Sequence, residues 1–201
     1  MGTINRWTLF CEQLFRLLKA VSFFQILKFN FALGAELRIS SAQDFVEFSN
    51  NVNKGSTYSG TTVFVDSDLS FSGRILEPIG KGPSSFFLGV FDGQGHVFSD
   101  IKMPSSADFV GLFVYSNGLA IKNVIIDGSC SITSSFIGSS SVHSGVIIGY
   151  CYSHSSPCTI ESTVNIGSIS FNGTINSTHA MALGGIAGKY ITSNHESSLK
   201  N

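Results

Sequence analysis

The stretch GLFVYSNGLAIKNVIIDGSCSI (residues 111–132) is the first of three similar copies in this sequence. The second copy, at 146–171, reads VIIGYCYSHSSPCTIESTVNIGSISF, and the third, from residue 185, reads GIAGKYITSNHESSLKN. Positions 121, 160 and 199 are each separated by 39 residues, as are 146 and 185, whereas 111 and 146 are separated by 35. We assign the four-residue difference to extra length in the loop at 151–158. Such a period predicts stacked units that cover one another's apolar faces.

Each copy contains short strand candidates separated by Gly and Ser turns, and none contains a helix long enough for a crossover between strands. Upstream, Val63, Val65, Leu69 and Phe71 alternate with polar residues, which is the period of a half-buried strand. The sequence therefore predicts a mainly β protein folded as a right-handed parallel β-helix, a solenoid in which equivalent apolar side chains form interior ladders. The expected ladders are Leu112, Ile147 and Ile186, and Ile121, Ile160 and Leu199.

The N-terminal residues differ in character from these copies. Between residues 7 and 33, apolar side chains recur at three- and four-residue steps, and residues 32–35 (ALGA) are small enough for signal-peptidase cleavage. We expect residues 1–35 to form a separate apolar, amphipathic helix that is an export signal or associates with a membrane. The alternatives are a plain packing helix and a misassigned start.

Residues 36–56 predict a second, short helix. Ser40 or Ser41 caps a helix over residues 40–52, Asp44 lies in its first turn, and residues 53–55 (NKG) end it. Because the open end of a solenoid exposes its interior, we interpret this helix as a cap, the alternative being an ordinary surface helix. The β-helix repeats then occupy residues 57–201. Since the third copy stops within a strand, we expect a truncated chain, with further coils or self-association at its C-terminal edge.

Three motifs in order, FDGQGH at 91–96, VGLF at 110–113 and IKNV at 121–124, resemble the GLUG-motif β-helix proteins. VDSDL at 65–69, EPIG at 77–80 and the capping helix fit the same pattern, so the resemblance covers roughly residues 38–201. Val114 and Val146 stand where that pattern has Gly. The family comprises repeat proteins of bacterial and protist surfaces, some of them parts of larger peptidases or adhesins. The resemblance implies a pectin-lyase-like solenoid in a surface setting, and by itself it implies no activity.

The composition excludes some partners. Only 12% of the residues are charged, against about 25% in a typical soluble domain, so the surface must be rich in neutral hydroxyl and amide groups. The net charge is −1 and the sequence has no cluster of basic residues, so we expect no nucleic-acid partner. No uninterrupted apolar run reaches the length of 18 residues that indicates a transmembrane helix.

The sequence allows several chemical states for the cysteines. Cys151 and Cys158 bracket the loop at 151–158, which predicts a disulfide at its base if the protein is exported. Free thiols, or a zinc site that also uses His143 and His154, are the alternatives, although the spacing fits no familiar zinc motif. The 39-residue spacing pairs Cys130 with Ile169, which predicts an inward, reduced thiol.

We expect no catalytic residue, metal or cofactor. The chain has only 13 Asp and Glu residues, and none of them recurs between copies, whereas carbohydrate-active β-helices need clustered carboxylates. Gly93 and Gly95 are interpreted as positive-φ turn residues. Asn123 and Asn201 share a turn position, and Lys122 pairs with Glu161. His143, His154, His179 and His195 lie in Ser-rich stretches and are expected to be solvated.

Two triplets, at Asn172 and Asn176, are candidate N-glycosylation sites. With the low charge and the repeats, they favour a non-catalytic repeat scaffold of the cell surface or extracellular space. Its role would be adhesion or display, with a cell-surface glycan or a protein as ligand. One alternative is the N-terminal fragment of a carbohydrate-active enzyme or peptidase whose catalytic part lies beyond residue 201. Another is a redundant gene fragment with no stable product.

Overall fold

The computed structural model describes residues 34–153, 157–175, 180–192 and 198–200. The chain divides into two compact units, Met1–Ala35 and Glu36–Asn201. The predicted N-terminal helix lies outside the described residues, except for its last two positions. Among the residues that are described, no helix is both long and apolar enough to cross a membrane.

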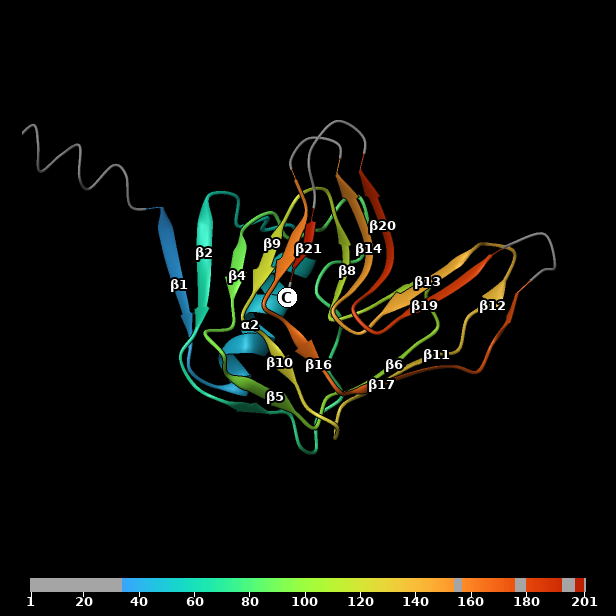
Figure 1. The fold of residues 1–201 in the computed structure, drawn as a ribbon, viewed down its shortest axis with the longest axis horizontal. Helices are drawn as coiled ribbons and strands as arrows, with labels where there is room; N and C mark the ends of the chain where they lie inside the picture. Colours follow the sequence, from blue (N-terminus) through green and yellow to red (C-terminus); the bar gives the residue numbers. More distant parts are fainter. Residues whose placement is uncertain (1–33, 154–156, 176–179, 193–197, 201) are drawn as a thin grey trace, which may run out of the picture. The chain divides into compact units, whose positions relative to one another are not determined.

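The second unit is built from short strands arranged as sheets, with one described helix, α2 (Ala42–Asn53) (Figure 1). A six-stranded sheet has the order β1 (Ala35–Ile39), β2 (Thr61–Val65), β4 (Val90–Asp92), β9 (Ala120–Lys122), β15 (Thr159–Glu161) and β21 (Ser198–Lys200). A four-stranded sheet has the order β16 (Val164–Asn165), β10 (Ile125–Ile126), β5 (Val97–Ser99) and β3 (Leu69–Ser70).

Four smaller sheets complete the unit. Three have three strands each: β17 (Ser168–Phe171), β11 (Ser131–Ser134) and β6 (Lys102–Ser105); β19 (Met181–Gly184), β13 (Val142–Gly145) and β7 (Phe109–Val110); and β20 (Ala187–Thr192), β14 (Ile148–Ser153) and β8 (Phe113–Ser116). The fourth pairs β12 (Ile137–Gly138) with β18 (Thr174–Ile175).

The strand ladders are parallel, and neighbours within a sheet come from separate passes of the chain. β9, β15 and β21, for example, lie side by side although other sheets contain the strands between them in sequence. The prediction of a mainly β protein is therefore confirmed, and its strands pair in parallel.

The register of the six-stranded sheet places equivalent residues side by side. Ile121 pairs with Ile160, and Ile160 pairs with Leu199, at the 39-residue spacing seen in the sequence. On the other side, Ile121 pairs with Phe91, and Phe91 pairs with Val63. The side chains of Val63, Phe91, Ile121 and Ile160 are all buried, so they form a continuous apolar row along the sheet.

The second expected ladder precedes β8, β14 and β20. Leu112 and Ile147 are buried, and Ile186 is partly buried against the same core. Ser116 pairs with Cys151, 35 residues later, whereas Ala120 pairs with Thr159, 39 residues later. The four additional residues therefore lie between Cys151 and Thr159, in the loop that the sequence indicated.

One predicted pairing is wrong. Ile169 pairs with Ile132, not with Cys130, because the turn from Asn165 to Ser168 is two residues shorter than the turn from Ile126 to Ser131. Cys130 is nevertheless a buried free thiol, and its Sγ donates a hydrogen bond to the carbonyl oxygen of Phe98 at 3.3 Å. Burial raises the pKa of this thiol above its ordinary value.

Helix α2 begins where its capping residues place it. The Ser41 hydroxyl accepts a hydrogen bond from the Asp44 amide at 3.2 Å, and the Asp44 carboxylate accepts one from the Ser40 amide at 3.0 Å. Phe45 and Phe48 project from its buried face into a cluster of phenylalanine rings. Edge-to-face contacts join Phe45 to Phe91 with ring centroids 6.1 Å apart, and Phe48 to Phe87 with centroids 5.4 Å apart. The apolar side of the helix thus covers part of the aromatic core.

Candidate functional site

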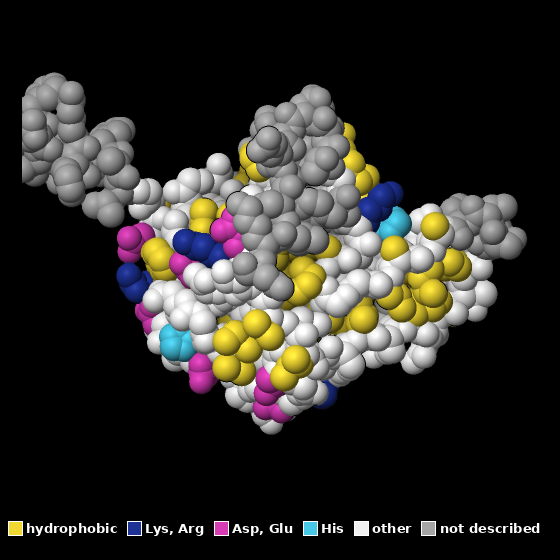
Figure 2. Space-filling model, in the orientation of Figure 1, with side chains coloured by type: hydrophobic (Ala, Val, Ile, Leu, Met, Phe, Trp, Pro, Cys, Tyr) yellow, Lys and Arg dark blue, Asp and Glu magenta, His cyan; other side chains and the backbone are white. Residues whose placement is uncertain are grey.

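A cleft of about 490 Å³ lies where the outward faces of the six-stranded and four-stranded sheets meet. Its volume is within the range of about 300–1,000 Å³ that is common for small-molecule sites. We call it the corner cleft. Figure 2 shows charged side chains on the side of the six-stranded sheet and hydrophobic side chains below them. Among the residues lining the cleft are Phe64, Asp92, Gln94, Asn123, Ile125 and Ser162.

One wall of the cleft includes Asp92, from which a row of alternating charge extends along the six-stranded sheet. Asp92 pairs with Lys122, and Lys122 pairs with Glu161, in the strand register. The Lys122 ammonium lies 3.1 Å from the Asp92 carboxylate. Opposite charges on neighbouring strands stabilise a sheet modestly, so this row ties successive strands together. The expected pairing of Lys122 with Glu161 is the one in the structure.

The aromatic end of the same wall is Phe64, which pairs with Asp92 in the register. The Arg38 guanidinium lies 5.1 Å from the centroid of the Phe64 ring and 2.8 Å from the Asp66 carboxylate. The cation therefore has both an aromatic and an anionic partner, and it holds the Phe64 ring from the side of β1.

Turn residues form the floor of the cleft. Gln94, Asn123 and Ser162 all have positive φ, between 47° and 55°, a conformation that Asn adopts more readily than most residues. Asn123 Nδ2 and the backbone amide of Gln94 both donate to Asp92 Oδ1, at 2.9 Å and 3.0 Å. Ser162 occupies the turn position equivalent to Asn123, 39 residues later. Asn201, expected at this position, lies outside the described residues.

Gly93 corrects one detail of the expected turn. Gly95 has a φ of +80° as predicted, but Gly93 is not among the residues with positive φ. A Cβ atom on Gly93 would lie 2.4 Å from the Asn123 carbonyl oxygen. Gly93 is therefore required by the close approach of the next turn and not by its backbone angle.

The opposite wall of the cleft is apolar. Val97 pairs with Ile125, and Ile125 pairs with Val164, so three aliphatic side chains follow one another across the four-stranded sheet. Val97 and Ile125 are half-buried, and Val164 is 51% exposed. Together with Phe64, this row gives the cleft apolar surface beside its fixed polar groups.

Among the described residues that line the cleft, Asp92 is the only one with a titratable side chain. Burial opposes its ionisation, but the hydrogen bonds from Asn123 and Gln94 and the nearby Lys122 ammonium outweigh burial, so the pKa of Asp92 lies below its ordinary value. The carboxylate is therefore a fixed, ionised acceptor at neutral pH. A lone, fully engaged carboxylate suits the binding of a ligand better than proton transfer to one.

This pKa shift predicts a pH dependence of stability. Because the folded-state pKa of Asp92 is depressed, its contribution is present above the ordinary aspartate pKa of about 3.9 and is lost as the pH falls through the folded-state value. We expect Asp92→Asn to lower the free energy of unfolding by about 1 kcal/mol at pH 7 and by less at pH 2.5. Urea unfolding at both pH values measures this difference, and a pH-independent difference would contradict the assignment.

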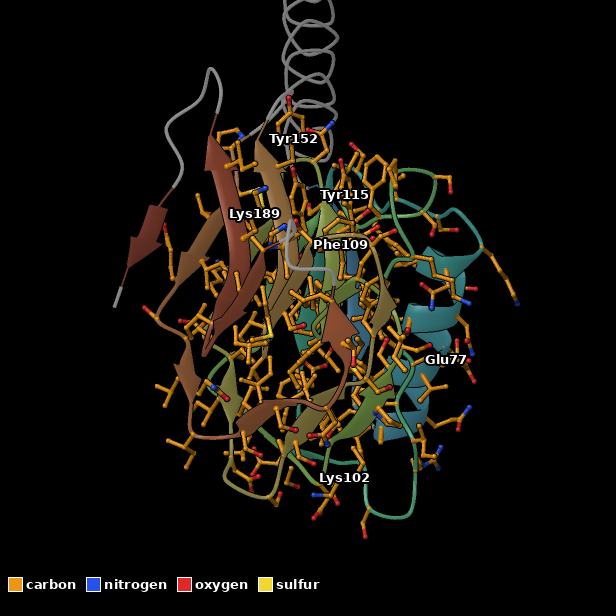
Figure 3. All side chains as sticks on the ribbon, turned by 90° about the vertical axis from the view of Figure 1, so that its right-hand side faces the viewer. Glu77, Lys102, Phe109, Tyr115, Tyr152 and Lys189 are labelled. Carbon is orange, nitrogen blue, oxygen red and sulfur yellow. A yellow bond between two sulfur atoms is a disulfide. The ribbon has the colours of Figure 1, made fainter. Side chains whose placement is uncertain are left out.

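A second outward surface consists of Phe109, Tyr115, His143, Tyr150 and Lys189, which we call the aromatic strip. Phe109 pairs with His143, and Tyr115, Tyr150 and Lys189 pair in sequence across β8, β14 and β20. The Tyr115 and Tyr150 rings stack with centroids 5.4 Å apart, and the Lys189 ammonium lies 5.6 Å from the Tyr150 centroid. Figure 3 shows Phe109, Tyr115 and Lys189 close together, with Tyr152 near them.

His143 is the main correction at this strip. The expectation that it is solvated is wrong, because it lies in β13 and is only 7% exposed. Its ring stacks on Phe109 with centroids 5.7 Å apart. Burial, together with the Lys189 charge, lowers the pKa of His143. The strand could not be recognised in the sequence because Ser residues surround His143. The 35-residue offset that aligns Tyr115 with Tyr150 could, however, have predicted that the side chains of the strip lie together.

The structure joins Cys151 and Cys158 by a disulfide at the base of the additional loop. Both sulfur atoms are thereby occupied, and the alternative zinc ligand His154 lies outside the described residues. Among the residues that are described, no three His, Cys, Asp or Glu side chains are grouped so that they could hold a metal ion. Asn172 is exposed between β17 and β18, while Asn176 is outside the described part of the chain.

Comparisons of this chain with models of protein families, with curated proteins and with solved structures found no match. The resemblance to the GLUG-motif proteins therefore remains a prediction from the residues that carry it.

Proposed function

We propose that this chain is a right-handed parallel β-helix, capped by α2, that serves as a non-catalytic repeat scaffold for adhesion or display. The observation that carries the proposal is the parallel register of Val63, Phe91, Ile121, Ile160 and Leu199 across five strands. Stacked units of this kind stabilise one another through their interior rows, so the outward positions can vary to suit a ligand. The family resemblance supports the same fold.

The proposed location is the cell surface or the extracellular space. The Cys151–Cys158 disulfide supports it, because disulfides persist in oxidising compartments. The exposed Asn172 in an N-glycosylation triplet, and the signal-like residues 7–35, support the same setting. Association of residues 7–33 with a membrane is the alternative role for that segment.

The non-catalytic role is supported by the corner cleft, where the one carboxylate among the described lining residues, that of Asp92, is already engaged by Lys122 and Asn123. No cofactor is proposed. The mixed charges of the outward row give no basic surface for a nucleic acid. We also propose that a further stacked coil or a second copy of the chain packs against the last described strands, which include β19. There Met181 and Leu183 are 48% and 42% exposed, whereas their register partners Val142 and Ser144 are buried.

Secretion of the full chain, with a C-terminal epitope tag, from a eukaryotic host tests this proposal. We expect the secreted protein to begin near residues 34–36, and Cys151 and Cys158 to be alkylated only after reduction. We also expect a mass decrease on glycosidase treatment that is smaller for Asn172→Gln. Immobilised secreted protein should retain cells better than the same protein after denaturation. Retention of Met1 together with free thiols at 151 and 158 would contradict the extracellular proposal.

A further inference from the structure

We propose that the corner cleft binds one neutral pyranose unit of a cell-surface glycan. This inference deepens the proposed function, on which it rests, by naming the site and the chemical class of its ligand. It depends on three properties of the cleft: the type of its polar groups, the placement of its apolar groups and the balance of its charges.

The polar groups are of the kind that bind sugar hydroxyls. Gln94 and Asn123 each carry an amide that both donates and accepts, and Ser162 carries a hydroxyl that does the same. The two amides are held in place, because Asn123 Nδ2 donates to Asp92 at 2.9 Å and Gln94 Nε2 donates to Asp66 at 3.4 Å. The Gly95 backbone amide also donates to the Asn123 carbonyl oxygen at 2.8 Å. A ligand would therefore meet groups that are already ordered, which reduces the entropy cost of binding.

The apolar groups lie where the C–H face of a pyranose ring would need them. Phe64 is half-buried and lies between Arg38 and Asp92, so its ring is held at the edge of the cleft. Ile125 and Val164 face the cleft from the other wall. A pyranose ring has hydroxyl groups around its rim and C–H groups on its faces, and it can contact both kinds of wall at once.

The charges of the cleft favour a neutral ligand. Asp92 is paired with Lys122 at 3.1 Å, and Arg38 beside the cleft is paired with Asp66 at 2.8 Å. No unmatched cation among the described lining residues would attract a carboxylate or sulfate. An extended peptide is also disfavoured, because peptides commonly bind by adding to a free strand edge. Of the strands beneath the cleft, β9 and β10 are paired on both sides, and the end strand β16 is only two residues long, which is too short an edge for an extended peptide.

The experiment uses the secreted full chain and free sugars as probes. D-glucose, D-galactose, D-mannose and N-acetyl-D-glucosamine are tested by saturation-transfer NMR and titration, with D-glucuronate as the anionic comparison. We expect at least one neutral sugar to bind with a Kd of about 1–10 mM, the range expected for so small a ligand. Immobilised oligosaccharides ending in that sugar should bind as well.

Two variants and a matched control locate the binding. We expect Phe64→Leu to weaken binding about tenfold and Gln94→Gly about threefold, as expected for the loss of a ring contact and of one hydrogen bond. Phe109→Leu, which changes another half-buried outward ring on a different sheet, should leave the affinity unchanged. Circular dichroism checks the fold of each variant. If Phe64→Leu unfolds, Gln94→Gly carries the test, because glycine suits the positive φ at that position.

Three results would overturn the assignment. The first is the absence of binding by all four neutral sugars up to 50 mM, and the second is binding that neither cleft variant weakens. The third is binding of D-glucuronate alone that is lost in Lys189→Ala, because this would place the ligand at the aromatic strip. Secretion, disulfide formation and glycan occupancy do not depend on sugar binding. A negative sugar test on a normally secreted protein therefore contradicts the cleft inference and leaves the scaffold proposal standing.

Discussion

Replacing Phe91 with alanine is expected to lower the free energy of unfolding by about 3–5 kcal/mol. Phe91 is fully buried and pairs with Val63 on one side and Ile121 on the other. Its ring also contacts Phe48 from α2 and Phe113 from β8, with centroids 5.9 Å and 5.4 Å apart. The substitution would thus remove a ring that joins the six-stranded sheet, the helix and the sheet that contains β8, and it would leave a cavity in the core.

Urea or guanidinium unfolding followed by circular dichroism measures this loss. Ile137→Ala is the control, because Ile137 is also a large apolar residue in a strand but is 79% exposed. We expect the control to change the free energy of unfolding by less than about 0.5 kcal/mol. Equal effects of the two substitutions would show that Phe91 does not lie in a packed interior row.

Gly145→Ala is expected to destabilise the protein by about 2 kcal/mol or more. A Cβ atom at Gly145 would lie 2.3 Å from the Ile148 carbonyl oxygen and 2.5 Å from the Gly188 amide nitrogen. Both are backbone atoms, of β14 and β20, which pair with each other and not with β13, so relief of the clash requires the backbone of β13 to move away from these two strands. Overpacking of this kind costs more than a clash with the end of a flexible side chain.

Gly128→Ala is the matched control for this prediction. The nearest atom to a Cβ at Gly128 is the Ile166 carbonyl oxygen, at 3.8 Å, which is an ordinary contact. We expect this variant to be as stable as the original or slightly more stable, because alanine reduces the conformational entropy of the unfolded chain. Thermal unfolding of the two variants side by side gives the comparison. If the Gly145→Ala and Gly128→Ala proteins unfold at the same temperature, the result would argue against the close packing of β13 and β20.

The pairing of Ile121, Ile160 and Leu199 could be predicted because the two intervals between them contain the same number of residues. The start of α2 could be predicted because a cap depends on neighbours in sequence, here Ser41 and Asp44. The helix cap depends on neighbouring residues and the strand pairing on a constant spacing, so both can be recognised in a single sequence.

The pairing of Cys130 could not be predicted in this way. A turn in the second copy is two residues shorter, so a constant period fails over that stretch even though it holds before and after. His143 shows a related limit. Its immediate sequence is typical of a polar loop, and only the adjacent β7 and β19 make it part of a buried strand.

The corner cleft was also not predicted. The sequence indicated that Asn123 is a turn residue and that Lys122 and Glu161 pair, but it did not place Phe64 near Ser162, almost a hundred residues away. Their common position at the cleft follows from the stacking of separate passes of the chain. Which outward side chains line one hollow depends on how sharply two sheets turn at their shared corner.

The sequence by itself determined the mainly β class, the repeat spacing and the capped helix, because periodicity and capping act between residues at short or constant separations. Only the tertiary structure decided the register across unequal turns, the burial of His143 and the convergence of side chains at the corner cleft. These features depend on contacts between strands that are distant in the chain, where a difference of two residues in one turn changes which side chains meet.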